Sequence, residues 1–305
     1  MAAPTITTRT LNEPKDVRDC SPSFHSHTAA AHIGLASGSQ PMSAWLLLGL
    51  LAPVASDALP GLQLPDTLHQ GDLVRARSQT EISVDGRHLQ RGPDGEVVFG
   101  LGRDQRRLEV CVNVTRQAVC AELPVAPRDW DIEKVSGLPQ QTVTPDPATA
   151  ARIAAEAARV AKARERNDQR IDYVGRWQQP AQGRISGVYG SQRIRNDVPG
   201  SPHYGLDIAA PTGTPVQAAA AGVVSLAEEG MVLSGHTILI DHGHGVSSVY
   251  IHLSRIDVSA GQRVQAGEVI GAIGSTGRAS GPHLHWGLNW FDVKLDPRSV
   301  LGNED

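Results

Sequence analysis

Aromatic residues are scarce in this chain of 305 residues, at 4% Phe, Trp and Tyr, whereas glycine (31) and proline (20) are frequent. This mix favours short strands joined by tight turns over a bundle of helices. The formal net charge of -4 is mild. It gives no basic footprint for nucleic acid and predicts no strong attraction to an anionic polymer. The length allows one large domain or two smaller ones, each with its own core.

Two common metal-binding motifs are missing. None of the cysteines, Cys20, Cys111 and Cys120, belongs to a C-x-x-C pair, which argues against a thiolate zinc site. No H-E-x-x-H occurs, so the general base of the helical zinc proteases is absent as well. Any histidine-based metal chemistry must therefore use another arrangement.

Cys111 and Cys120 flank a stretch that reads as a hairpin. If its turn is centred on Thr115-Arg116, the two cysteines face each other across the strands, and the geometry allows a disulfide. A disulfide would suit an oxidising compartment, and two buried free thiols are the alternative.

Long hydrophobic runs are also lacking. The run from Ala44 to Val54 is too short to span a bilayer comfortably and has the length of a signal-peptide core. Small residues at Ser56–Ala58 offer a cleavage position. We interpret Met42 as the true start and residues 1–41 as a miscalled extension, although no Lys or Arg lies between Met42 and the run. The prediction is export to the periplasm or cell envelope, with membrane contact only through this signal; a buried strand or a membrane anchor is the alternative.

The rest of the chain is expected to be mainly β. Residues 59–126 predict a small domain resembling a β-sandwich, with turns at Asp85-Gly86 and Pro93–Gly95 between alternating runs. Residues 127–175 predict a linker and a helix. Residues 176–305 predict a compact antiparallel β domain, because strand-like runs are separated by glycine-containing turns.

The helix has strong start signals: Asp146 as its cap and Pro147 at its first position. We predict that it extends over 148–172. Its thin apolar stripe comprises Ile153, Ala157, Val160 and Ala161. A linking helix is favoured over a spacer or lid above a functional site.

Three histidine motifs of the C-terminal domain carry chemistry. His203-Tyr-Gly-Leu-Asp207 gives H-x-x-x-D, His252 lies near the end of a strand, and His283-Leu-His285 gives H-x-H. On a strand, His283 and His285 share one face. Two imidazoles and a carboxylate would make a zinc site with a fourth position open for water.

The chain carries H-x-x-x-D at 203–207, Y-x-H-L at 250–253 and G-P-H-x-H at 281–285. With these motifs in this order, it resembles the lysostaphin-type (LytM-like) zinc endopeptidases, and the stretches 203–216 and 261–271 are also typical of that family. The resemblance covers about residues 180–300. It implies that His203, Asp207 and His285 bind Zn²⁺ and that His252 and His283 are catalytic histidines outside the ligand set. Some family members carry a Tyr before the first ligand to stabilise the oxyanion; Arg195–Pro199 contains none.

Other residues are expected to be structural. His242 and His244 form a second H-x-H, but its glycines indicate a turn, so it is given a structural or site-rim role. His236 and Tyr250 are predicted to pack rather than to act in catalysis.

The predicted function is hydrolysis of the peptide cross-links of bacterial peptidoglycan, with its peptide stems as the partner and Zn²⁺ as the cofactor. The main alternative is a non-catalytic relative that binds the cell wall or activates an amidase. A lipoyl-like carrier is set aside, because the turn within 264–271 has no Lys at its tip.

Overall fold

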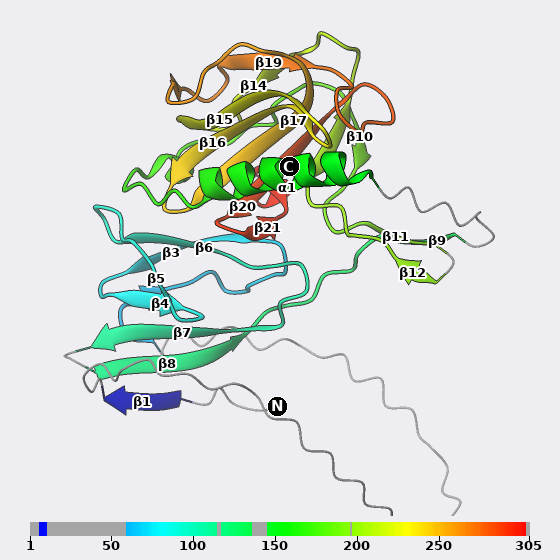
Figure 1. Ribbon diagram of the computed structural model, residues 1–305. Helices are drawn as coiled ribbons and strands as arrows, with labels where there is room; N and C mark the ends of the chain where they lie inside the picture. Colours follow the sequence, from blue (N-terminus) through cyan, green and yellow to red (C-terminus); the bar gives the residue numbers. More distant parts are fainter. Residues whose placement is uncertain (1–5, 11–58, 115–116, 136–144, 196, 303–305) are drawn as a thin grey trace, which may run out of the picture.

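The structure is a computed structural model that describes residues 6–10, 59–114, 117–135, 145–195 and 197–302. These residues form mainly antiparallel β-sheets, as the sequence predicts, with one long helix (Figure 1). The predicted signal-peptide core, 44–54, lies outside the described residues. Among the described helices, none has both the length and the apolar character needed to cross a bilayer.

Two small sheets make up the N-terminal part. One has the strand order β1-β8-β7-β4-β5 and the other the order β2-β3-β6, and their buried side chains join one apolar core. The strands are β1 (Ile6–Thr10), β2 (Leu62–Gln63), β3 (Leu73–Ser78), β4 (Ile82–Val84), β5 (Arg87–His88), β6 (Glu96–Gly100), β7 (Arg107–Val114) and β8 (Gln117–Pro124). Pairing of β1 with β8 is not predicted by the sequence, in which residues 1–41 show no alternation.

Of the turns predicted in this part, Asp85-Gly86 and Pro93–Gly95 are confirmed, and Thr115-Arg116 lies outside the described residues. Asp85 and Gly86 have positive φ angles of 46° and 77° between β4 and β5, as a two-residue hairpin requires. In the β7–β8 hairpin, Cys111 pairs directly with Cys120, and a disulfide joins them. The alternative of two free thiols is therefore wrong.

The predicted helix is α1 (Pro147–Arg164). Its cap is confirmed, because the Asp146 carboxylate accepts hydrogen bonds from the backbone N–H groups of residues 148 and 149, each at 3.0 Å. It ends earlier than predicted. The segment that follows is bound to the large sheet instead: the Asp168 carbonyl accepts from the His244 N–H, and Arg170 pairs with Asp241.

The packing face of α1 matches the predicted stripe only in part, because Val160 packs as predicted and the two alanines do not. Ala157 and Ala161 are exposed, whereas Glu156 is buried and accepts hydrogen bonds from Arg152 Nε and from the Val232 N–H, both at 2.8 Å. The apolar contact is made by residues 160 and 163, which pack on Leu226, Leu239 and Val249 of the large sheet. Ala157 and Ala161 were wrongly assigned to the packing face. A carboxylate such as that of Glu156 can be buried when two hydrogen-bond donors reach it, and the neighbouring alanines are then left exposed.

A short three-stranded sheet ties the linker to the C-terminal domain. Its order is β12-β11-β9, and β9 lies parallel to β11. The strands are β9 (Ile132–Val135), β11 (Gln192–Arg195) and β12 (Val198–Pro199).

The C-terminal domain is built on a ten-stranded sheet, whose main path is β10-β13-β20-β17-β16-β15-β18. The strands are β10 (Arg184–Gly187), β13 (Leu206–Ala209), β14 (Pro215–Gln217), β15 (Gly222–Met231), β16 (Gly235–Gly243), β17 (Val246–Ile256), β18 (Arg263–Val264), β19 (Val269–Ile273), β20 (His283–Trp290) and β21 (Val293–Leu295). Two short 3₁₀ helices flank them, η2 (Asp172–Val174) and η3 (Pro297–Val300). One face of β20 is buried through Leu284, Trp286 and Leu288, and the other face carries its histidines.

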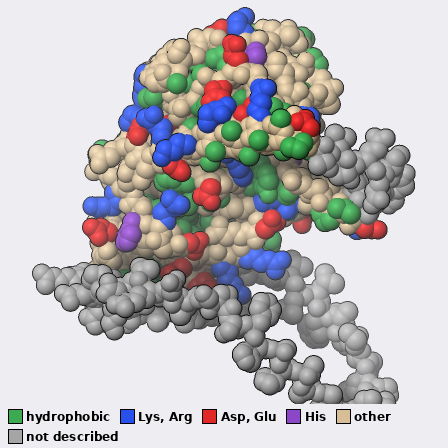
Figure 2. Space-filling model, in the orientation of Figure 1, with side chains coloured by type: hydrophobic (Ala, Val, Ile, Leu, Met, Phe, Trp, Pro, Cys, Tyr) green, Lys and Arg blue, Asp and Glu red, His purple; other side chains and the backbone are tan. Residues whose placement is uncertain are grey.

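The N-terminal part and the large sheet pack against each other, and they come closest at Gly100, which has no side chain. A Cβ added at Gly100 of β6 would lie 2.8 Å from the Leu295 side chain and 2.8 Å from that of Trp290. Glycine at this position therefore allows the two sheets to approach. On the face drawn in Figure 2, basic and acidic side chains are interspersed rather than gathered into a patch of one sign.

Candidate metal centre

Two neighbouring strands present the centre of the site. In β13, Leu206 and Ile208 are buried in the core, so Asp207 between them points to the opposite face. Asp207 pairs directly with His285 of β20, and the carboxylate Oδ1 lies 2.8 Å from His285 Nδ1. The strand alternation alone thus brings a carboxylate and an imidazole into contact.

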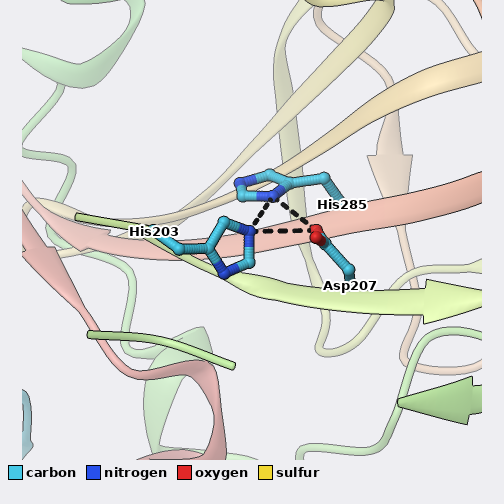
Figure 3. Close-up of side chains that lie close together, drawn as sticks. All are labelled: His203, Asp207 and His285. Atoms are coloured by element: carbon cyan, nitrogen blue, oxygen red, sulfur yellow. Dashed lines mark hydrogen bonds and ion pairs between the residues drawn. The ribbon is translucent and has the colours of Figure 1, made fainter. Parts of the chain in front are cut away.

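His203 reaches the same point from the loop before β13. Its backbone N–H donates to the Ser191 carbonyl at 2.8 Å, and its ring Nδ1 lies 3.0 Å from the Val188 carbonyl, to which it donates. This leaves Nε2 as the lone-pair nitrogen, 3.0 Å from Asp207 Oδ1 and 3.0 Å from His285 Nδ1 (Figure 3). The backbone carbonyl therefore selects the tautomer that a metal ligand needs.

The three ligand atoms fit a metal ion. They all lie within 4.8 Å of one another. Nitrogen and oxygen ligands at ~2.0–2.1 Å from a tetrahedral zinc stand ~3.3–3.4 Å apart, so the three atoms need to separate by only a few tenths of an ångström. The side chains of His203, Asp207 and His285 are 24%, 22% and 17% exposed, which leaves the site open to a further ligand.

The electrostatics favour a deprotonated carboxylate. Burial raises the pKa of Asp207, but hydrogen bonds and charge from His203 and His285 outweigh it and hold that pKa well below its usual range. For His203, burial opposes the charged form, yet the Asp207 hydrogen bond and charge raise its pKa. Burial lowers the pKa of His285. A cation between these groups would replace the protons that the histidines otherwise share with Asp207.

Two further histidines lie beside this cluster. The rings of His252 and His283 are 4.8 Å apart between centroids, and His283 Nε2 is 4.0 Å from Asp207 Oδ1. Each ring has its Nδ1 against a backbone carbonyl, that of Thr276 at 2.8 Å for His252 and that of Gly281 at 2.9 Å for His283. Donation from Nδ1 leaves both Nε2 atoms free to accept a proton.

His252 is held in an unusual backbone conformation. Its φ angle is 64°, a region that non-glycine residues rarely adopt, and its N–H donates to the Ser234 carbonyl at 2.9 Å. Outliers of this kind gather at functional sites. Burial lowers the pKa of His252, which keeps its imidazole neutral near pH 7.

Two glycines back the cluster, and sequence reasoning did not identify them as site residues. A Cβ added at Gly187 would lie 2.5 Å from Asp207 Oδ2, and one at Gly205 would lie 2.6 Å from His285 Nε2. Both positions depend on chain segments that approach from elsewhere in the fold. No local signal in one sequence reveals this.

The second H-x-H stays apart from the cluster. His242 is buried, with Nδ1 2.7 Å from the Ala221 carbonyl and Nε2 2.8 Å from Ser248 Oγ. His244 is bonded to the Tyr173 hydroxyl at 3.2 Å. Both histidines have structural contacts, as expected.

His236 and Tyr250 also fill structural positions. His236 Nδ1 accepts from the Gly230 N–H at 3.0 Å, and the buried Tyr250 hydroxyl accepts from the Ala219 N–H at 2.9 Å.

The antiparallel β domain carries a solvent-accessible His–Asp–His cluster, and two further histidines lie beside it. This combination is typical of a metallopeptidase. Residues 201–297 match the model of Peptidase family M23, and the chain carries a domain of this LytM-like family.

Relatives agree with this assignment. The chain is 44% identical over 99 residues to DD-carboxypeptidase/endopeptidase Mpg of Neisseria meningitidis, covering 32% of this chain and 22% of the relative. It is 44% identical over 88 residues to peptidoglycan DD-endopeptidase ShyA of Vibrio cholerae, covering 29% of this chain and 20% of the relative. The chain thus spans about a fifth of the length of these relatives.

A solved structure extends the likeness beyond the peptidase domain. A Pseudomonas aeruginosa protein assigned to peptidase M23 superposes with a TM-score of 0.58 at 27% identity. The match covers 80% of this chain and 95% of that protein, so the arrangement of the N-terminal sheets and the peptidase domain is shared.

Proposed function

We propose that this protein is a zinc-dependent endopeptidase that hydrolyses the peptide cross-links of bacterial peptidoglycan. The observation that carries the proposal is the convergence of His203, Asp207 and His285 on one point, with His252 and His283 beside it. The names of two relatives, a DD-carboxypeptidase/endopeptidase and a peptidoglycan DD-endopeptidase, support the substrate class.

His203 Nε2, Asp207 Oδ1 and His285 Nδ1 would hold the zinc ion. Two imidazole nitrogens and one carboxylate oxygen are a donor set that zinc prefers, and three protein ligands leave a position for water or substrate. When bound, zinc in such a site lowers the pKa of its water to about 7 and polarises a carbonyl group.

His252 and His283 would move the proton. Their Nδ1 atoms are bound to backbone carbonyls, so each ring is fixed in orientation with Nε2 left to accept a proton, and His283 Nε2 lies 4.0 Å from Asp207 Oδ1. The lowered pKa of His252 favours its neutral form, which accepts the proton of the attacking water. The protonated imidazole would then stabilise the developing oxyanion by its charge until it returns that proton to the leaving amine.

The proposed bond, for a diderm organism, is the D-alanine to diaminopimelate cross-link, and the proposed place of action is the periplasm or cell envelope. The bond is inferred from the family and from export. The place of action is inferred from the signal-like run 44–54 and from the Cys111–Cys120 disulfide. Disulfides persist mainly in oxidising compartments.

A non-catalytic relative that binds the wall or activates an amidase is the competing function. Loss of metal ligands is the feature we would expect of such a protein. Here all five histidine and aspartate residues are present, and the ligand atoms of His203, Asp207 and His285 lie within 4.8 Å of one another, which supports the enzyme.

The test is digestion of purified cross-linked peptidoglycan by the full chain loaded with zinc, followed by mass spectrometry of the muropeptides. We expect cross-linked dimers to be converted to monomers, and a chelator to stop the conversion until zinc is restored. His285→Ala is the matched control and should not cleave. Zinc bound at one ion per chain without any cleavage would favour the non-catalytic function.

A further inference from the structure

A tight turn at residues 188–191 holds His203, the first of the three proposed metal ligands. The His203 ring donates from Nδ1 to the Val188 carbonyl at 3.0 Å, and its backbone N–H donates to the Ser191 carbonyl at 2.8 Å. The His203 carbonyl in turn accepts from the Gly190 N–H at 2.8 Å. Gly190 has a φ angle of 83°, which a residue with a side chain rarely adopts. The position and ring orientation of His203 therefore depend on where this turn lies.

An arginine of the N-terminal part is bonded to this turn. Arg103, between β6 and β7, donates from Nε and from Nη2 to the Gly190 carbonyl, at 3.0 Å and 2.9 Å. Its Nη1 pairs with Asp104 at 2.7 Å. The Arg103 side chain is only 9% exposed, and a buried guanidinium is costly to the fold unless its donors are used. Both bonds to the Gly190 carbonyl thus help to keep Arg103 at the turn.

Trp130 of the linker packs over the same glycine. A Cβ added at Gly190 would lie 2.0 Å from Trp130 Cε3, so the indole ring occupies the space that a side chain would need. The Arg103 guanidinium lies 5.2 Å from the centre of that ring, in a cation–π contact. Strand β9, which follows Trp130, runs parallel to β11, which follows the turn (Figure 1). The N-terminal part and the linker therefore both contact the turn.

We propose that Arg103 is a positioning residue for the metal centre, because it holds the Gly190 carbonyl and thereby the turn that orients His203. The inference rests on the proposed zinc site and gives the N-terminal part a role in the metal chemistry. Among the described residues, Arg103 makes no hydrogen bond to a metal ligand, so its effect passes through the turn. Without its two N–H donors, the turn would be less firmly held, and His203 would move with it.

Arg128 separates this role from simple packing between the two parts of the protein. Its guanidinium lies 5.0 Å from the centre of the Trp130 ring, and its Nη2 pairs with Asp296 of the C-terminal domain at 2.8 Å. Arg128 thus joins the same parts of the chain and contacts the same ring. Its side-chain hydrogen bonds, however, go to Gln70 and Asp296 and not to the turn. A variant at Arg128 is therefore the matched control.

The first test is zinc affinity, measured by equilibrium dialysis of full-chain variants against zinc buffers. Arg103→Met keeps an unbranched apolar side chain but loses the donors, and we expect it to bind zinc about tenfold more weakly, as when a group that orients a metal ligand is removed. Arg103→Lys keeps the charge beside Asp104 and an ammonium donor, so its loss should be smaller. Arg128→Met should bind zinc as tightly as the unmodified protein.

The second test is amide hydrogen exchange of the metal-free proteins, followed by NMR. The N–H groups of Gly190 and His203 are both bonded within the turn. Relative to the amides of β17 in the same protein, they should exchange about tenfold faster in Arg103→Met and at the unmodified rate in Arg128→Met. This readout separates local loosening of the turn from a general loss of stability.

Unchanged zinc affinity in Arg103→Met would overturn the proposal, and so would an equal loss in Arg103→Met and Arg128→Met, which would indicate a packing role. If Arg103→Met does not fold, Arg103→Lys decides by the same two measurements, and no loss in either overturns the proposal. Failure of the proposed function is distinguishable, because the unmodified protein would then bind no zinc. In that case amide exchange decides: faster exchange at Gly190 and His203 in Arg103→Met alone supports the positioning role, and equal rates overturn it.

Discussion

Asp207 and His285 face each other directly across the β13–β20 pair, with Oδ1 2.8 Å from Nδ1. Because each would supply one of three ligands, we expect His285→Ala and Asp207→Ala to lose bound zinc together with activity. Zinc content per chain, measured by mass spectrometry on the dialysed protein, checks this.

His283→Ala is the informative comparison, since His283 shares the strand face of His285 but lies outside the ligand set. Its zinc content should stay near that of the unmodified protein, while turnover drops about a hundredfold or more through loss of a proton carrier. If His283→Ala loses zinc and His285→Ala retains it, the two roles are reversed.

Gly205 is expected to be as important to the metal centre as a ligand. An added Cβ would lie 2.6 Å from His285 Nε2, so Gly205→Ala should displace that ring and lower both zinc affinity and activity. Gly102→Ala is the control, because its nearest neighbour, Val293 Cγ1, is 3.9 Å away. Equilibrium zinc binding by competition with a chelating dye measures the effect. Equal affinities of the two variants would contradict this account of the packing.

His242 should make the fold sensitive to mild acid. Burial lowers its pKa to about 4, against about 6.5 in the unfolded chain, so unfolding takes up a proton between these values. Its contribution to stability is fully present above about pH 6.5 and is lost as the pH falls toward 4. From about pH 7 to about pH 5 the free energy of unfolding should drop by about 2 kcal/mol on this account.

The matched variant is His242→Gln, which keeps a donor for the Ala221 carbonyl and an acceptor for Ser248. Urea unfolding at both pH values should give a smaller drop for this variant, by about the 2 kcal/mol that His242 contributes. Its zinc content should be unchanged, because His242 is bonded to structural partners. An identical drop in both proteins would place the acid sensitivity elsewhere.

The Cys111–Cys120 disulfide closes a short loop, with a sequence separation of 9. Constraint of the unfolded chain by such a loop is worth about 2–3 kcal/mol. Cys111→Ser combined with Cys120→Ser should therefore lower the free energy of unfolding by that amount, as measured by urea titration. A reductant should lower the stability of the unmodified protein and leave that of the double variant unchanged.

Much of the fold could be predicted because its signals are local. The Asp85-Gly86 turn, the Asp146 cap and the strand runs of the large sheet depend on residues next to one another in sequence. The shared face of His283 and His285 follows from strand alternation in the same way. The gathering of His203, Asp207, His252 and His285 could be anticipated only through the family resemblance, since it joins segments far apart in sequence.

The features that could not be predicted depend on contacts between segments that lie far apart in the sequence. Glu156 is buried on α1 because Val232 of a distant hairpin supplies an N–H donor, and no periodicity within the helix indicates this. Gly187 and Gly205 are needed because ligand side chains pass close to them. The sequence also does not predict that Asp241, Ser247, Asn289 and Lys294 lie side by side on four neighbouring strands. Only the strand register brings them together.

The contact at Gly100 links two units that the chain order presents as separate. Phe99 of β6 and Trp290 and Leu295 of the large sheet belong to one continuous apolar core. Melting either part would expose apolar surface of the other to water, so neither has a free energy of unfolding of its own. Calorimetry should accordingly record one endotherm, with the van't Hoff enthalpy close to the calorimetric enthalpy, in place of two transitions.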